Sequence, residues 1–217
     1  MMAGNTVLER IKRERIVAIA RGVQPGDMAA LADALLAGGI SCIEFTMDHS
    51  GRIAPGDMLN ALAAIRQAKG DAVAVGVGTV LTPQQVRMSA DAGAQFVLSP
   101  DFSPEVVEQT KSLGLVSIPG AMTSSEIVQA SGCGADIVKL FPAGSLGSGY
   151  LRSIRGPLPH IPLSAVGGIS AGNAAEFLAA GADCLGVGGR LVDLKAIAVG
   201  DFAAITAAAR ELVEAVS

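Results

Sequence analysis

Ala135-Asp136-Ile137-Val138-Lys139-Leu140-Phe141-Pro142 is a short, mostly apolar stretch with one lysine set into it. Its length and its apolar residues predict a strand that is buried on both faces, as in a parallel sheet. An unpaired ammonium is costly to bury there, and such a lysine usually has a lowered pKa. Lys139 would then be a neutral amine that can attack a carbonyl carbon, as Schiff-base catalysis requires. The alternative is a strand-end lysine whose stem packs while its head group reaches water.

Similar short apolar runs recur along the chain and alternate with alanine-rich, helical stretches. Together they predict strands at Ile16–Ala20, Cys42–Thr46, Ala72–Val77, Phe96–Leu98, Val116–Ile118, Ile137–Phe141, Leu163–Val166 and Cys184–Val187. Their centres lie roughly 20 to 30 residues apart, the length of a strand–loop–helix–loop unit. Eight such units without a break in composition predict an α/β fold, a (β/α)8 TIM barrel forming a single domain over residues 1–217. A charged amphipathic helix at Val7–Arg15 precedes it, and an open, doubly wound sheet is the alternative architecture.

Three similar phrases stand where a helix is expected to meet the next strand. They are Ala37-Gly38-Gly39-Ile40, Asp91-Ala92-Gly93-Ala94 and Ala180-Gly181-Ala182-Asp183. Glycine there predicts a left-handed cap that ends the helix, on the structural end of the barrel. The opposite end, after each strand, is where a barrel enzyme keeps its chemistry.

Composition excludes several classes of function. Half of the residues are apolar and the net charge is −4, so no basic surface is expected to bind nucleic acid. No apolar run reaches about 18 residues, and no membrane span is expected. Cys42, Cys133 and Cys184 stand far apart without metal-ligand spacing. We therefore predict reduced core thiols, a cytoplasmic location, and neither a metal nor a cofactor.

Two charged residues near strand ends add to Lys139. Side chains alternate along a strand, so Lys139 inside the barrel requires Val138 and Leu140 outside, against helices. Glu44 within the second strand would also be desolvated, which suits an acid or base that moves protons; the alternative is a simple counter-ion. Arg21 ends the first strand, where it can bind an anion.

Glycine pairs end the last two strands, in Gly167-Gly168-Ile169-Ser170 and Gly188-Gly189-Arg190. Glycine lets backbone N–H groups approach an anion, and a helix beginning at Ser170 adds its dipole, so the pairs predict a phosphate site. Ser170 as an ordinary N-cap is the alternative. Gly76-x-Gly78 lacks the third glycine of a dinucleotide site.

Four segments in this order carry a family resemblance. They are Ile43-Glu44-Phe45-Thr46, residues 76–85 (GVGTVLTPQQ), residues 137–143 (IVKLFPA) and Gly167-Gly168-Ile169-Ser170. The chain resembles the 2-keto-3-deoxy-6-phosphogluconate (KDPG) and 4-hydroxy-2-oxoglutarate (KHG) aldolase family from Val17 to about Val192. The resemblance implies a class I mechanism without metal, a homotrimer of barrels, and a place in Entner–Doudoroff carbohydrate metabolism.

The resemblance also implies roles for single residues. Lys139 resembles the Schiff-base lysine and Glu44 the carboxylate that moves protons. Thr79 and Pro100 match positions that shape the pyruvate pocket, and Phe141 matches a residue packed against the bound keto acid. The phosphate end is matched by Gly167, Gly168, Gly189 and Arg190.

The chain departs from the family pattern at Asp48, where many members carry an arginine that binds the substrate carboxylate. Relatives that resemble the galactonate-type aldolase carry an arginine after the first strand instead, and Arg21 stands there. We therefore predict that Arg21 takes over the carboxylate contact. Asp48 and His49 are then free to contact substrate hydroxyls or to cap a loop. Arg190, where some relatives carry serine, either strengthens phosphate binding or points into solvent.

The implied reaction cleaves a 2-keto-3-deoxy-6-phospho sugar acid, or 4-hydroxy-2-oxoglutarate, to pyruvate and an aldehyde (glyceraldehyde 3-phosphate or glyoxylate). A small-molecule keto acid is thus the expected partner. The alternatives are a phosphosugar epimerase or isomerase that uses Glu44 and Lys139 as acid and base, and a non-catalytic barrel that binds sugar acids.

Overall fold

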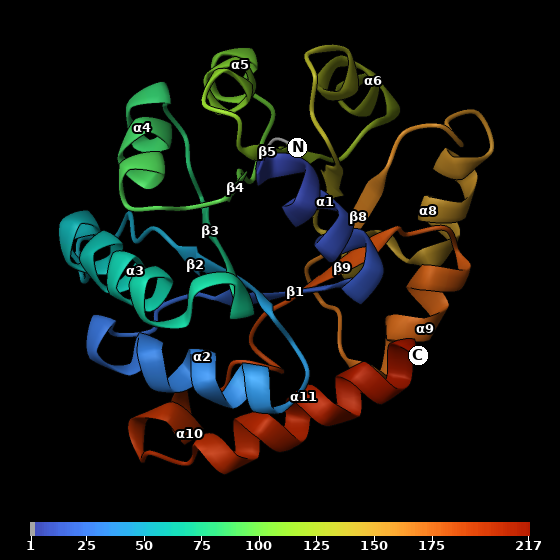
Figure 1. Ribbon diagram of the computed structural model, residues 1–217. Coiled ribbons are helices and arrows are strands. Elements are labelled where there is room, and N and C mark those ends of the chain that lie inside the picture. The colour runs from blue at the N-terminus through green and yellow to red at the C-terminus, as the bar shows by residue number, and fades with distance from the viewer. Residues whose placement is uncertain (1–2) are drawn as a thin grey trace.

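The computed structural model describes residues 3–217, in which parallel strands alternate with helices around a central barrel (Figure 1). The strands are β1 (Ile16–Ala20), β2 (Cys42–Thr46), β3 (Ala74–Gly78), β4 (Phe96–Leu98), β5 (Val116–Ile118), β6 (Gly120–Ala121), β7 (Val138–Leu140), β8 (Leu163–Val166) and β9 (Cys184–Val187). They pair in the order β5-β4-β3-β2-β1-β9-β8-β7-β6, and every pairing is parallel. The predicted barrel is confirmed, and the open doubly wound sheet is not what forms.

The barrel closes because β5 and β6 are two parts of one segment, separated by Pro119. β5 pairs with β4, and β6 pairs with β7. Across the interruption, the carbonyl of Ser117 accepts from the Asp136 amide at 3.0 Å and that of Pro119 from the Lys139 amide at 2.8 Å. The fifth predicted strand is confirmed as β5, and β6, which was not predicted, continues the segment beyond the proline to β7. Proline interrupts the pairing because it has no N–H to donate to a ladder.

The helices cover the outside of the barrel (Figure 1). They are α1 (Ala3–Glu14), α2 (Met28–Ala37), α3 (Pro55–Lys69), α4 (Pro83–Asp91), α5 (Pro104–Ser112), α6 (Ser124–Gly132), α7 (Ala143–Leu146), α8 (Ser148–Arg155), α9 (Ala171–Ala179), α10 (Leu194–Ala198) and α11 (Phe202–Val216). Val138 and Leu140 are fully buried in the core between strands and helices, so the predicted alternation along this strand is confirmed. Figure 1 shows α11 beside α2, where the Thr206 hydroxyl donates to the carbonyl of Ala34 at 3.0 Å.

The N-terminal helix α1 lies across one end of the barrel (Figure 1). Val7 and Ile11 on its apolar face pack into an interior cluster with Val17, Phe96 and Ile137. The predicted helix exists but ends one residue early, at Glu14, because Arg15 adopts a left-handed φ of 59°. This end of the barrel is therefore closed by apolar packing.

Local predictions were mostly right. Gly39, Gly93 and Gly181 have φ of +92°, +87° and +108°, as predicted for left-handed helix ends. The third strand begins at Ala74 rather than Ala72, because residues 70–72 form a 3-10 turn, η2. The strand that holds Lys139 is shorter than predicted and spans β7 only.

The cysteines and the helices bear on two further predictions. All three cysteines are free; Cys42 and Cys184 are buried, but the prediction of a core thiol was wrong for Cys133, which is half-buried at the end of α6. Within residues 3–217, every helix is too short or too polar to cross a membrane.

Candidate active site

Lys139 points into the barrel from β7. Its Cα lies opposite Gly120 on one side and Ser164 on the other, and the side chain is 5% exposed. It lines a cavity of about 370 Å³, and its Nζ lies 4.9 Å from the centroid of the Phe141 ring. The amine is thus inside the barrel with an aromatic face beside it, not among the outer helices.

Burial lowers the pKa of Lys139 below its usual value of 10.5, because a desolvated ammonium is less stable than the neutral amine. The negative charge of Glu44 acts in the opposite direction, and the positive charge of Arg21 adds to the lowering. The net effect is a lowered pKa, which increases the fraction of neutral amine at a given pH. The neutral amine is the form that attacks a ketone.

Glu44 lies on β2 and is 1% exposed. Its Oε1 accepts a hydrogen bond from the Thr46 hydroxyl at 2.8 Å, while its buried Oε2 has no partner among the described residues. A Cβ added to Gly78 on the neighbouring strand would lie 1.6 Å from Oε1, so the carboxylate occupies the space that this glycine leaves free. An unpartnered buried carboxylate oxygen is costly, and such groups are typical of functional sites.

Arg21 follows β1 and lines the same cavity as Lys139. Its Nη2 donates to the Thr79 hydroxyl at 3.3 Å, so these two predicted site residues meet. Thr79 has a left-handed φ of 57°, which is rare for a residue with a branched Cβ, and its carbonyl lies 2.8 Å from His49 Nε2. The backbone of Thr79 is thus tied to the loop after β2.

The glycine pair after β8 forms one wall of the cavity. Gly167 and Gly168 have φ of +90° and +77°, and a Cβ on Gly167 would lie 3.1 Å from the Phe141 ring. The Gly144 amide donates to the Gly167 carbonyl at 2.7 Å, and a Cβ on Gly144 would lie 2.8 Å from that oxygen. Close backbone approach at this wall therefore depends on glycine at each of these positions.

The helix that follows this wall, α9, begins after Ser170. The Ser170 amide donates to Asn173 Oδ1 at 2.8 Å, which makes Ser170 an N-cap residue, as the alternative reading of this serine held. The N-cap and the glycine wall occur together, and the first residues of α9 line a neighbouring cavity of about 310 Å³ that shares Arg190 with the first.

Seven of the ten predicted site residues line the one cavity: Arg21, Lys139, Phe141, Gly167, Gly168, Gly189 and Arg190. Glu44 and Thr79 lie outside the lining but act on Lys139 and Arg21 as described above. Pro100 is not part of the lining; its carbonyl stands where a Cβ of Gly120 would be, 2.2 Å away. Its link to the site runs through Gly120, the strand neighbour of Lys139.

Asp48 caps the loop after β2. Its Oδ1 accepts from the Ser50 amide and hydroxyl at 3.0 and 2.6 Å, and its Oδ2 accepts from the Arg52 and Ile53 amides at 2.6 and 2.9 Å. The Ser50 hydroxyl and the backbone amides hold the pKa of this carboxyl well below its usual range. Of the two roles predicted for Asp48, capping a loop is the one that the structure has.

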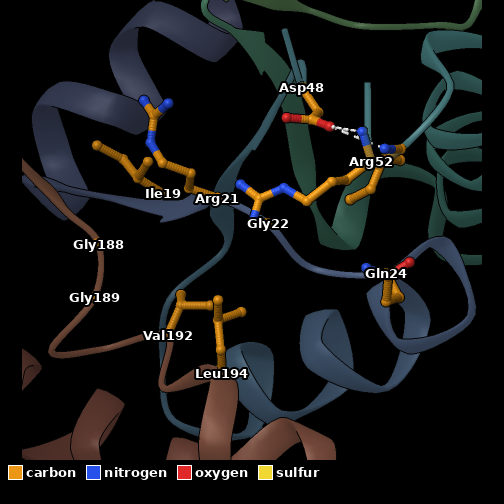
Figure 2. Close-up of a pocket in the computed structure, with 11 residues that line it drawn as sticks. Ile19, Arg21, Gly22, Gln24, Asp48, Arg52, Gly188, Gly189, Val192 and Leu194 are labelled. Atoms are coloured by element: carbon orange, nitrogen blue, oxygen red, sulfur yellow. Dashed lines mark hydrogen bonds between the residues drawn. The ribbon is translucent and has the colours of Figure 1, made fainter. Parts of the chain in front are cut away.

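A second cavity, of about 420 Å³, adjoins the first. Ile19, Arg21, Gly188 and Gly189 line both. Figure 2 shows the side chain of Arg52 reaching across the second cavity toward Arg21 and Gly22. Sequence reasoning missed Arg52, Gly78 and Gly144. Gly78 could have been found, because a glycine on the strand beside a buried carboxylate indicates that the side chain needs the space. The sequence has no comparable signal for Arg52.

Within residues 3–217, no three His, Cys, Asp or Glu side chains gather in a way that could hold a metal ion.

Comparisons with known proteins agree with this geometry. The sequence model of the KDPG and KHG aldolases matches residues 7–208. The chain is 36% identical over 212 residues to the 2-dehydro-3-deoxy-phosphogluconate aldolase of Treponema pallidum, covering 97% of this chain and 98% of that protein. It is 32% identical over 174 residues to the 2-dehydro-3-deoxy-6-phosphogalactonate aldolase of Escherichia coli, covering 80% and 81%. A crystal structure of KDPG aldolase from Legionella pneumophila, with pyruvate captured as a covalent carbinolamine, superposes with a TM-score of 0.82 at 30% identity, covering 91% and 93%.

Proposed function

Because the chain belongs to the KDPG and KHG aldolase family, and is therefore a lyase, we propose that it is a class I aldolase whose Schiff-base lysine is Lys139. The observation that carries the proposal is the burial of this amine inside the barrel, in one cavity with Arg21, Phe141 and the glycine wall; this burial lowers its pKa. The Legionella relative, in which pyruvate is held covalently, supports the same chemistry.

The reaction begins when the Lys139 amine attacks the C2 ketone of the substrate. A carbinolamine forms, and loss of water gives a cationic imine that can accept the electrons of the C3–C4 bond. Glu44, directly or through a water molecule, takes the proton of the C4 hydroxyl while C3–C4 breaks and the aldehyde leaves. The remaining enamine is protonated at C3, and hydrolysis of the imine releases pyruvate and restores the amine.

Binding groups at both ends fix the substrate. Arg21, held by the Thr79 hydroxyl, binds the carboxylate next to the reacting ketone. The glycine wall at Gly167 and Gly168, together with Gly189 and Arg190, binds a distal phosphate. Holding the substrate at both ends can lower the activation barrier by several kcal/mol, because the reacting groups no longer lose translational and rotational freedom in the chemical step.

The substrate that we propose is a 2-keto-3-deoxy-6-phospho sugar acid, with 4-hydroxy-2-oxoglutarate as the other candidate. The gluconate and galactonate aldolases among the relatives support the first class. A homotrimer of barrels, a cytoplasmic location and a role in the Entner–Doudoroff pathway remain predictions from the resemblance and the composition.

The decisive experiment is borohydride reduction in the presence of pyruvate, followed by mass spectrometry of the peptides. We expect a pyruvyl adduct on Lys139, no adduct and no turnover in Lys139→Ala, and an adduct with slowed turnover in Glu44→Gln. Turnover by Lys139→Ala would refute the scheme. Substrate binding without any adduct would instead support an epimerase, an isomerase or a non-catalytic barrel.

A further inference from the structure

The second cavity contains one arginine, Arg52, that the proposed reaction does not use. Arg21 and Arg52 both line it, and Asp48 is the acidic residue in its wall. All four hydrogen bonds that Asp48 accepts come from its own loop, so its lone pairs are directed away from the cavity. Within residues 3–217, neither guanidinium group has a carboxylate within 4.0 Å. The Arg52 guanidinium is therefore a positive charge without a counter-ion in the wall of this cavity.

The loop after β2 holds Arg52 in this position. Asp48 binds the Arg52 and Ile53 amides, which turns the chain back toward the barrel. Ser50, itself bound to Asp48, accepts a hydrogen bond from Arg52 Nε at 2.8 Å. The guanidinium is thus pre-oriented over the cavity, as Figure 2 shows, with its terminal nitrogens free for a ligand. Pre-orientation lowers the entropy lost when a ligand binds.

The position of the cavity relates it to the reaction. Its shared wall with the catalytic cavity includes Ile19 and the pair Gly188 and Gly189, whose backbone lies beside both spaces. A substrate fixed at C2 by Lys139 can therefore extend its far end into the second cavity. The remaining walls are largely apolar, with Val192 and Leu194 on one side, so a charge there would be partly desolvated and its contacts strengthened.

We propose that Arg52 is a specificity-determining residue, and that the second cavity is a subsite for a carboxylate on the aldehyde half of the substrate, as in 4-hydroxy-2-oxoglutarate. The inference rests on the proposed aldolase function, in which the glycine wall and Arg190 already bind a distal phosphate. It assigns to Asp48 the role of positioning residue for Arg52, in place of the arginine that many family members carry at that point of the chain. A carboxylate binds a guanidinium through two parallel hydrogen bonds.

The test compares Arg52→Gln with Arg152→Gln. Arg152 is exposed on α8, so this control makes the same change of charge away from both cavities. Pyruvate release is measured with three keto acids, whose aldehyde halves carry a phosphate, a carboxylate or no charge. We expect Arg52→Gln to lower kcat/KM roughly tenfold for the carboxylate substrate, mainly through KM, and less than about twofold for the phosphate and neutral substrates. A loss on the phosphate substrate as large as that on the carboxylate substrate would overturn the proposal.

Two measurements distinguish failure of this inference from failure of the proposed aldolase function. Borohydride trapping of pyruvate alone should proceed equally in the wild type, in Arg52→Gln and in the control, because pyruvate lacks the aldehyde half. Asp48→Ala should reproduce the losses of Arg52→Gln, and the double variant should lose no more than Arg52→Gln alone. Equal losses on all three substrates, no loss on the carboxylate substrate, or slowed pyruvate trapping in Arg52→Gln would each overturn the proposal. Absence of a pyruvate adduct in the wild type would remove the proposed function, and this inference with it.

Discussion

Substitution of Gly78 by alanine tests whether the position of Glu44 governs catalysis. A Cβ at residue 78 would lie 1.6 Å from Glu44 Oε1 and 2.1 Å from its carboxyl carbon. The oxygen must retreat by about 1.4 Å merely to reach 3.0 Å, a separation that is still tight. Gly78 has no left-handed backbone conformation, so the conflict is one of space rather than of backbone strain.

The expected effect on turnover is large because proton transfer depends on geometry. General acid–base catalysis contributes about 10²- to 10⁴-fold, and a displacement of about 1 Å can cost on the order of 10²-fold. We expect Gly78→Ala to lower kcat roughly 100-fold, while pyruvate still forms an adduct on Lys139. Overpacking should also lower the free energy of unfolding by about 1–3 kcal/mol.

The control is Gly149→Ala on α8, where an added Cβ meets no atom within 4 Å. We expect this variant to keep full activity and to change the free energy of unfolding by less than about 1 kcal/mol. A double-mutant cycle with Glu44→Gln then identifies the cause, because two changes that act through one carboxylate are not additive. If the double variant turned over much more slowly than Glu44→Gln, or if Gly78→Ala retained near-normal kcat, the reasoning would be refuted.

Three further predictions concern charge. The rate of pyruvate trapping should rise with pH through a midpoint below 10.5, the usual pKa of a lysine. Arg21→Gln removes a positive charge and should raise that midpoint, whereas Glu44→Gln removes a negative charge and should lower it. Shifts in the reverse directions would contradict the causes assigned to the lowered pKa of Lys139. The free energy of unfolding should rise with pH between the lowered pKa of folded Lys139 and 10.5, because the unfolded chain binds more protons than the folded chain in this pH range. Urea titrations of Lys139→Met at several pH values should lack this rise. Asp136→Ala should lower the free energy of unfolding by about 1–3 kcal/mol, because Asp136 accepts hydrogen bonds from Lys111 Nζ and from a backbone amide of β5. Lys111→Ala removes only the first of these bonds and should lower it by less than about 1 kcal/mol. Equal losses of unfolding free energy in urea titrations of the two variants would show that the amide contact contributes little.

Much of the fold was predictable because parallel strands that are buried on both faces leave continuous apolar runs in the sequence. Strand alternation places Ile137, Lys139 and Phe141 on one face, and the apolar Val138 and Leu140 suit the opposite face, against the helices. The fifth strand was predicted at Val116–Ile118, as β5 is, but its continuation as β6 beyond Pro119 was not predicted, because a proline usually ends or interrupts a central strand. The burial of Cys133 was misjudged because its neighbours are apolar or glycine, while its own position is the exposed end of a helix.

Site residues that lie on strands could be predicted from the sequence. Contacts that depend on the course of a loop, or on the pairing register of two strands, could not. Lys139 and Glu44 were identified from charge within apolar runs. The contact between Glu44 and Gly78 requires the exact pairing of β2 with β3, in which Thr46 lies opposite Gly78, and one sequence does not specify that pairing. Arg52 depends on a loop whose course is set by four hydrogen bonds to one carboxylate. Asp48, which at first reads as the loss of a binding arginine, is what directs that loop.

The direction of Lys139 is fixed by residues that take no part in the chemistry. Ile137, two residues earlier on the same face, is fully buried in the apolar layer that α1 closes with Val7 and Ile11. A slip of β7 by one residue would turn Ile137 out of this layer and Lys139 toward the helices, so burial of Ile137 opposes it. The same apolar layer closes the barrel at the end occupied by α1, while Lys139 lines the cavity on its other side. The N-terminal helix therefore supports the proposed reaction through the register of β7 and through the exclusion of water from this end of the barrel.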